Sequence, residues 1–218
     1  MTTFLLLPGA GGEAWFWHRV VPELAAHGHE AVPVDLPGDD ETAGWAEYTA
    51  IALAALDGRP DPVVVAQSMG AFLGPLLCTE LPVRALVLVN PMIPAPGETA
   101  GQWWEATGQA EARAAEGFTD FDVHRDFFHD MPADLVADLE KGGRNQSDHS
   151  FADPYPLTAW PDVPTTVLAA EDDRLFPPAF QRRVARERLG LDVVTVPGGH
   201  LNALSHPKEV AEALEQAV

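Results

Sequence analysis

Six short apolar runs are spaced along the chain, and several of them are continuous rather than alternating with polar residues. Runs of this kind are typical of strands that are buried on both faces of a parallel sheet. We therefore predict strands at residues 4–7, 31–34, 63–66, 85–89, 165–170 and 191–196.

Longer segments with helical spacing of apolar residues lie between these runs. They cover residues 15–27, 45–56, 71–80, 178–189 and 207–217. Each segment is long enough to cross back over a sheet. Alternating strands and helices of this length predict an α/β class domain that is right-handed and doubly wound, with a mostly parallel sheet of about six strands.

The alternation stops between residues 91 and 160. This tract is rich in proline, glycine, aromatic and acidic residues, with helical pieces near residues 101–115 and 132–141. We interpret it as a helical cap inserted into a single domain whose core comprises residues 1–90 and 161–218. A chain of 218 residues, 46% of them hydrophobic, is long enough to bury one such core.

The formal net charge of -20 narrows the classes of partner that we expect. Nucleic acids and anionic membranes both bind basic surfaces, so we expect neither as a partner. The single cysteine, Cys78, excludes an internal disulfide, and the apolar run at residues 4–7 is too short for a signal peptide. We expect a cytoplasmic protein, and the sequence leaves its oligomeric state open.

Ser68 stands between the third predicted strand and the helical segment that follows it. Its surroundings, Ala66-Gln67-Ser68-Met69-Gly70, match the pattern G-x-S-x-G except that alanine replaces the first glycine. Small residues at these two positions let a strand reverse sharply into a helix, so that the serine hydroxyl projects at the turn. An ordinary strand-to-helix turn is the alternative, but we favour a nucleophilic serine.

Two later strand ends carry the groups that such a serine requires. Glu171-Asp172-Asp173 follows the fifth predicted strand, and Gly198-Gly199-His200 follows the sixth. Either aspartate could instead cap the next helix, and the turn at His200 could be a surface loop. His206 is a rival base, but its place just before a helix suits a role in helix initiation. Together, a serine, an aspartate and a histidine in this order favour a catalytic triad.

The loop after the first predicted strand supports two interpretations. In the first, the N–H group of Ala10 joins that of Met69 in an oxyanion hole. In the second, Gly9-Ala10-Gly11-Gly12-Glu13-Ala14 is a dinucleotide fingerprint, G-x-G-x-x-A, with Asp35 ending the next strand. The bulky Trp15-Phe16-Trp17 would crowd a pyrophosphate, and a dinucleotide site leaves the triad candidates without roles. We therefore favour the oxyanion hole and expect no cofactor.

Aromatic residues are concentrated in the predicted cap, which suits an apolar pocket over the serine. The cap's own small core would produce the same composition. As pocket residues we select Gly9, Trp103, Trp104, Phe127, Phe128 and Leu201. His124, His129 and Asp130 share one helical stretch without a further matched ligand, so we predict no metal site.

These motifs give the chain a resemblance to the α/β-hydrolase superfamily, in particular to the branch of plant methyl esterases and S-selective hydroxynitrile lyases. The resemblance spans nearly the whole length. It is carried by residues 4–17, Pro22-Glu23-Leu24, Gly28-His29, Asp35-Leu36, Gln67-Ser68-Met69-Gly70, residues 173–181 and Gly198-Gly199-His200. The match at 173–181 implies that Asp173, rather than Asp172, is the acid of the triad.

Three departures from the patterns of this branch bear on the activity. The family usually has His-Gly where this chain has Pro8-Gly9, and the lyases have a threonine at the Gly9 position and a lysine where this chain has Leu201. The resemblance therefore implies hydrolysis rather than cyanohydrin cleavage. We expect a cofactor-independent serine hydrolase acting on small or medium apolar carboxylic esters. The alternatives are a low-turnover binding module, a C–C lyase and a dinucleotide-binding protein. Pro8 favours the binding module.

Overall fold

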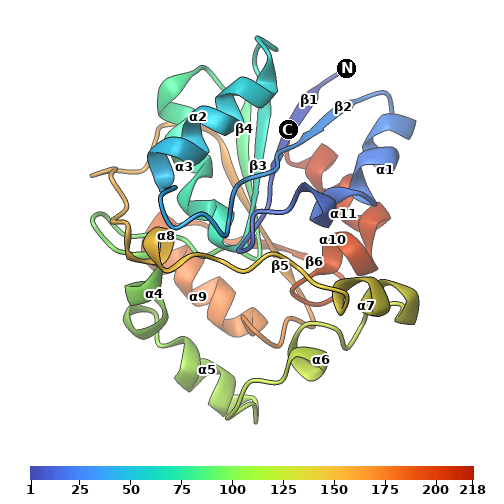
Figure 1. The fold of residues 1–218 in the computed structure, drawn as a ribbon, viewed down its shortest axis with the longest axis vertical. Coiled ribbons are helices and arrows are strands. Elements are labelled where there is room, and N and C mark those ends of the chain that lie inside the picture. The colour runs from blue at the N-terminus through green and yellow to red at the C-terminus, as the bar shows by residue number, and fades with distance from the viewer.

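The computed structural model describes all 218 residues and contains one six-stranded sheet (Figure 1). Its strands are β1 (Thr3–Leu7), β2 (Glu30–Pro33), β3 (Val63–Gln67), β4 (Ala85–Val89), β5 (Thr165–Ala170) and β6 (Val193–Val196). They lie in the order β2-β1-β3-β4-β5-β6, and each neighbouring pair is parallel. The predicted α/β fold with a parallel sheet is confirmed.

Side chains within each central strand alternate between two hydrophobic cores. In β1, Leu5 and Leu7 belong to one core, whereas Phe4 and Leu6 belong to the other. All four side chains are fully buried. Burying one such side chain stabilises the fold by about 1.5–3 kcal/mol. The strands read as unbroken apolar runs because both faces of the sheet are covered.

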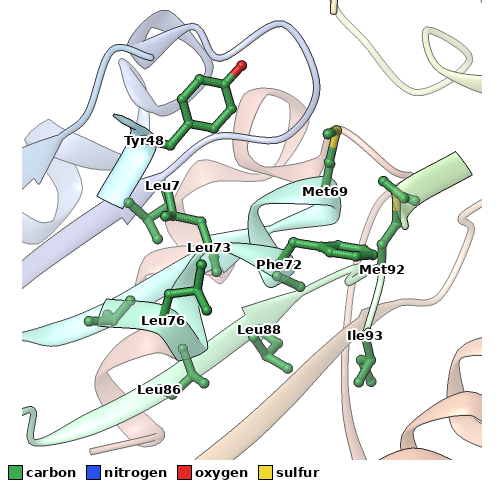
Figure 2. Close-up of a cluster of buried hydrophobic side chains, with 14 of the residues drawn as sticks. Leu7, Tyr48, Met69, Phe72, Leu73, Leu76, Leu86, Leu88, Met92 and Ile93 are labelled. Atoms are coloured by element: carbon green, nitrogen blue, oxygen red, sulfur yellow. The ribbon is translucent and has the colours of Figure 1, made fainter. Parts of the chain in front are cut away.

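Two groups of helices cover the two faces (Figure 1). The first core lies under α2 (Trp45–Leu56), α3 (Gly74–Glu80) and α9 (Pro178–Leu189). Figure 2 shows part of it, where side chains from β1 and β4 meet those of the segment after β3. The second core lies under the 3₁₀ helix η1 (Ala14–Trp17) and helices α1 (Val20–Ala26), α10 (Asn202–Ser205) and α11 (Pro207–Gln216). This is the doubly wound arrangement that the sequence predicts.

Two predicted helices are each divided in the structure. The segment 15–27 forms η1 and then α1, and the segment after β3 forms a 3₁₀ helix, η2 (Ser68–Phe72), and then α3. Pro22 and Pro75 lie in the first turns of α1 and α3. A proline lacks the N–H that a continuous helix needs, but its φ suits a first turn. Each proline therefore begins a new helix.

The sixth strand begins two residues later than predicted, because Gly190 and Leu191 form the cap that follows α9. Gly190 adopts the left-handed conformation there, with a φ of 68°. The N–H groups of Gly190 and Leu191 then donate to the carbonyl oxygens of Arg186 and Ala185. This pattern satisfies carbonyl groups that a helix end leaves open.

Five helices lie between β4 and β5, in the segment that we interpret as a cap. They are α4 (Ala100–Ala106), α5 (Gln109–Ala115), α6 (Val123–Asp126), α7 (Ala133–Leu139) and α8 (Asp148–Ala152). The predicted helix at 101–115 is divided by Gly108, which has a φ of 64°. In Figure 1 this segment runs past the lower ends of the strands, which are their carboxyl ends. None of the helices has the length and apolar composition needed to cross a membrane.

Candidate active site

Ser68 is the first residue after β3 and has a φ of 51°. Residues other than glycine seldom adopt this left-handed conformation, which costs about 1–3 kcal/mol and persists only where the surrounding packing enforces it. The chain reverses here from β3 into η2. The sharp turn places the serine at the carboxyl end of a central strand, as the elbow motif predicts.

Small residues around Ser68 make this turn sterically feasible. A Cβ atom on Gly70 would lie 2.6 Å from the carbonyl oxygen of Pro8, and one on Gly74 would lie 2.9 Å from the Cβ atom of Ala66. Both distances are too short for a side chain. The Ala66 methyl group, which stands where the motif has glycine, fits because Gly74 has no side chain opposite it.

The structure brings Ser68, Asp173 and His200 together. Nε2 of His200 lies 3.1 Å from Oγ of Ser68, and Nδ1 of His200 lies 2.8 Å from Oδ2 of Asp173. All three residues are buried, with at most 8% of their surface exposed. They come from the ends of β3, β5 and β6. A nucleophile bonded to a base, which is in turn oriented by a carboxylate, is the geometry of an activated serine.

The Asp173 carboxylate accepts hydrogen bonds at both oxygen atoms. Oδ1 accepts from the backbone N–H groups of Leu175 and Phe176, at 2.9 and 2.8 Å. Oδ2 accepts from Nε2 of Gln181 at 3.2 Å, in addition to its contact with the histidine. Asp172 is exposed instead. Neither aspartate caps α9, whose first turn starts from Pro177 without a side-chain cap.

Aromatic rings fix the His200 imidazole from two sides. Its ring centroid lies 4.8 Å from that of Phe176 and 5.3 Å from that of Phe127, both in edge-to-face geometry. Such packing restricts rotation of the imidazole. The rival base His206 lies elsewhere, with Nδ1 at 2.9 Å from Oγ of Ser205 and at 3.6 Å from Oδ2 of Asp130.

A cavity of about 440 Å³ opens beside Ser68 and His200. Most of its wall is apolar, which suits a small organic ligand. The wall is formed by Ala10, Gln67, Ser68, Met92, Trp104, Gln109, Arg113, Phe121, Phe127, Phe151, Leu175, His200 and Leu201. The predicted pocket residues Trp104, Phe127 and Leu201 are among them.

Three predicted pocket residues do not line this cavity. Trp103 is fully buried in the first core, where its indole N–H donates to the carbonyl oxygen of Ile93 at 2.9 Å. Phe128 packs edge-to-face against His124 instead. Gly9 lies behind the serine, where a Cβ atom would approach the Ser68 Cβ atom to 3.0 Å.

Comparison with known proteins places this chain in a family. A family model described as "Alpha/beta hydrolase family" matches residues 4–213. The chain belongs to the alpha/beta hydrolase family. This finding, with the esterase-named relatives below, confirms the resemblance drawn from the sequence and the expectation of an esterase-like hydrolase.

Several relatives of this alpha/beta hydrolase are similar in sequence or structure. The alpha/beta hydrolase nvfD of Aspergillus novofumigatus is 27% identical over 98% of this chain and 95% of its own length. "Probable esterase PIR7A" of Oryza sativa subsp. indica is 33% identical, but over only 45% of this chain and 42% of its own. The crystal structure of polyneuridine aldehyde esterase superimposes with a TM-score of 0.82 at 19% identity, covering 99% and 98% of the two chains. This last likeness concerns the fold.

Asn90, directly after β4, lies within the candidate site of this alpha/beta hydrolase, although the motifs did not indicate it. It is fully buried and has a φ of 46°. Its Oδ1 atom accepts from the N–H of Ala170 at 2.8 Å, and its Nδ2 atom donates to the carbonyl oxygen of His200 at 3.1 Å and to Oδ1 of Asn202 at 3.3 Å. The side chain thus joins the ends of β4 and β5 to the histidine loop. A polar residue ending a fully apolar strand is the signal that could have indicated it.

The glycine-rich loop of the alpha/beta hydrolase is covered by another part of the chain. The N–H of Gly11 donates to Oε1 of Gln146 at 2.8 Å, and a Cβ atom on Gly11 would lie 2.6 Å from the carbonyl oxygen of Arg144. Asp35 accepts from the N–H of Ala14 and pairs with Arg144, both at 3.1 Å. A dinucleotide would need this space and these groups, so the structure disfavours that alternative.

Ala10 occupies the exposed tip of the same loop. It lines the cavity together with Ser68, and its N–H group donates to no acceptor within the protein. Met69 directly follows Ser68, and its side chain is buried as part of the first core. Only the backbone of Met69 is therefore available to a ligand beside the serine.

Proposed function

We propose that this protein is a serine hydrolase that cleaves carboxylic esters through an acyl-enzyme intermediate. The observation that carries the proposal is the position of His200, between Oγ of Ser68 at 3.1 Å and Oδ2 of Asp173 at 2.8 Å. The three residues lie beside an apolar cavity of about 440 Å³. Family membership supports hydrolysis in general, and several relatives bear esterase names.

In the first half of the reaction, His200 accepts the Ser68 proton while Oγ attacks the ester carbonyl carbon. Asp173 holds the imidazole in the tautomer whose Nε2 is free to accept that proton. The N–H groups of Met69 and Ala10 donate to the developing oxyanion. His200 then returns the proton to the departing alcohol, which leaves the acyl group on Ser68.

In the second half, a water molecule replaces the alcohol. His200 takes a proton from the water, the resulting oxygen nucleophile attacks the acyl carbon, and the acid is released as Ser68 regains its proton. The buried triad and the apolar wall favour this chemistry because electrostatic interactions are stronger away from bulk water. The cavity size suits small or medium esters.

The proposal is tested by hydrolysis of a p-nitrophenyl ester series of increasing acyl length. The wild-type protein should hydrolyse at least the shorter members, and the Ser68→Ala variant should show no triad-dependent turnover. Circular dichroism of both proteins controls for folding. A fluorophosphonate probe should label the wild-type protein on Ser68. Equal rates in the two proteins would overturn the proposal.

A second candidate function is a binding module with little turnover. Pro8 favours it, because proline replaces the histidine that the resembled family has beside the oxyanion loop. In the structure Pro8 is buried, and its carbonyl oxygen packs against Gly70. Tight binding of an apolar ester by Ser68→Ala, without hydrolysis by the wild-type protein, would support this function.

A further inference from the structure

Three polar residues outside the triad line the cavity, and one of them, Gln67, contacts His200 through its Nε2 atom. The other two interrupt the apolar wall away from this contact, and the proposed chemistry at Ser68 uses neither of them. Gln109 and Arg113 both line the cavity and are 6% and 8% exposed. They lie four residues apart on α5, so their side chains project from the same face of that helix. Burying these groups is costly unless each finds a hydrogen-bond partner.

The Arg113 guanidinium is held in place but retains unused donors. Its Nε atom donates to the carbonyl oxygen of Arg174 at 3.1 Å. Its Nη2 atom donates to the carbonyl oxygen of Asp120 at 3.0 Å and to Oδ2 of Asp126 at 2.5 Å. The Nη1 atom has no acceptor within the protein. A guanidinium carries five N–H donors in a fixed plane, so the two on Nη1 remain for a ligand.

Gln109 presents the complementary group. Its Nε2 atom donates to the carbonyl oxygen of Leu175 at 2.7 Å, which fixes the orientation of the side-chain amide. The Oε1 atom accepts no hydrogen bond from the protein. The anchors of both side chains, Arg174 and Leu175, directly follow the triad residue Asp173. A donor and an acceptor are thereby fixed relative to the proposed catalytic groups.

The charge around Arg113 indicates which ligand group fits. Asp126 is fully buried and forms ion pairs with Arg113 and Arg125 at 2.5 and 2.7 Å. Burial alone would raise the pKa of Asp126, but hydrogen bonds from Arg125 and from the N–H of Asp122 outweigh it and lower the pKa. Asp126 is therefore ionised. Arg125 also pairs with Asp120 at 2.9 Å, so two carboxylates balance the charges of Arg113 and Arg125. The chain as a whole carries a net charge of -20, which disfavours an anionic ligand.

We propose that Arg113 and Gln109 determine specificity by binding a second, uncharged oxygen on the apolar body of the ester. A carbonyl oxygen would accept from Nη1 of Arg113, and a hydroxyl group could in addition donate to Oε1 of Gln109. Keto and hydroxy esters are therefore better ligands than hydrocarbon esters of the same shape. This inference rests on the proposed function for its choice of an ester.

The test measures binding to the Ser68→Ala variant by calorimetry, so that the esters stay intact. The ligands are three matched series of ethyl esters, which carry a keto group, a hydroxyl group or a methyl branch at the same position, progressively further from the ester. At the best position the keto ester should bind about tenfold more tightly, which is the effect of one good hydrogen bond of about 1.4 kcal/mol. Ethyl levulinate and ethyl isocaproate are the first pair.

Two further variants, both made in the Ser68→Ala background, show which of the two residues produces the difference in affinity. Arg113→Met should bring the affinity ratio of keto to branched esters close to one, while Asp126 keeps Arg125 as its ion-pair partner. Gln109→Met should leave the keto ratio unchanged and reduce the affinity only for hydroxy esters. Because Gln109→Met removes no charge, it remains informative if Arg113→Met does not fold.

Several outcomes would overturn the inference. These are equal affinities for keto and branched esters at every position, a keto preference unchanged in Arg113→Met, and tighter binding of half-esters that carry a carboxylate. The proposed function is judged separately, by hydrolysis in the wild-type protein. Selective binding of keto esters without hydrolysis would contradict the proposed hydrolase function but support the recognition site. Hydrolysis without this selectivity would support the hydrolase function but contradict the recognition site.

Discussion

The side chain of Asp173 lies 2.8 Å from the imidazole of His200, whereas the preceding Asp172 is exposed. Asp173→Asn should lower kcat for a p-nitrophenyl ester about 10⁴-fold, because an amide can donate to Nδ1 and so stabilise the wrong tautomer. Asp172→Asn is the matched control and should keep its turnover. Loss of activity in the control, with a fully active Asp173→Asn, would show that the wrong carboxylate has been assigned.

The close approach of Gly74 to Ala66 leads to a prediction about stability. In Gly74→Ala, the new Cβ atom would lie 2.9 Å from Ala66 and 3.0 Å from Leu86, both fully buried. We expect the free energy of unfolding to fall by about 1–3 kcal/mol, the usual cost of overpacking a core. Denaturant titration measures it.

Gly101→Ala provides the control for this substitution. Gly101 is exposed in α4, and a Cβ atom there would approach no atom closer than 3.4 Å. Alanine favours helix over glycine by about 1 kcal/mol, so this variant should be at least as stable as the wild-type protein. If both substitutions were neutral, the tight packing behind the serine turn would be refuted.

Asn90 connects β4 and β5 to the loop that carries His200. Asn90→Ala removes three hydrogen bonds from a fully buried site, to Ala170, His200 and Asn202. Leaving buried groups unpaired costs about 1–3 kcal/mol each, so the melting temperature should fall. Because the displaced group is the proposed base, kcat should fall more than KM rises. An unchanged kcat in the folded variant would limit Asn90 to a structural role.

The ion pairs of Asp126 predict how stability changes in acid. The pKa of Asp126 is lowered from its ordinary value of 3.8, although burial opposes this, by bonds from Arg125 and Asp122. The associated stabilisation is complete above the ordinary value and is lost as the pH falls through the lowered one. Asp126→Asn should therefore be less stable than the wild-type protein near neutral pH, by about 3 kcal/mol.

The difference between these two proteins should narrow in strong acid, where the wild-type carboxylate is protonated. Melting temperatures measured at neutral pH and below the ordinary aspartate range test this. Asp120→Asn is the control, because the Asp120 side chain is 72% exposed and such ion pairs contribute little. A constant gap between wild type and Asp126→Asn across this range would contradict the assignment.

Cys78 should be an unreactive thiol in the native protein. Burial raises its pKa from 9.0 to about 12, and Sγ lies 3.3 Å from the carbonyl oxygen of Gly74. At a given pH the thiolate fraction is then smaller by about a thousandfold, and the thiolate is the reactive species. Ellman's reagent should react slowly with the folded chain and rapidly in denaturant. Rapid reaction without denaturant would contradict this.

The sheet and the triad candidates could be predicted because local sequence determines them. A strand buried on both faces is a continuous apolar run, and the turns after β3, β5 and β6 carry Ser68, Asp173 and His200 directly. Pro22 and Pro75 were also visible in the sequence. The helix breaks do not appear in the apolar periodicity, because apolar spacing alone continues across each proline.

The cavity wall depends on long-range packing that no local pattern encodes. Trp103 and Trp104 are neighbours on α4, yet only Trp104 lines the cavity, because successive helical residues point in different directions. Gln109 and Arg113 lie on α5, whose polar and alanine-rich sequence is typical of a surface helix. Both are buried because partners after β5, at Arg174 and Leu175, cover and bind them.

The order of the strands also determines when this site can first exist. Ser68 and His200 are 132 residues apart in the chain, and the strand that leads to His200 is the last one made. A ribosome-bound chain ending before residue 200 therefore lacks the base, however well its earlier strands have formed. In refolding, closure of such a distant pair is slow compared with helix formation. Return of esterase activity should accordingly lag behind the return of helical circular dichroism.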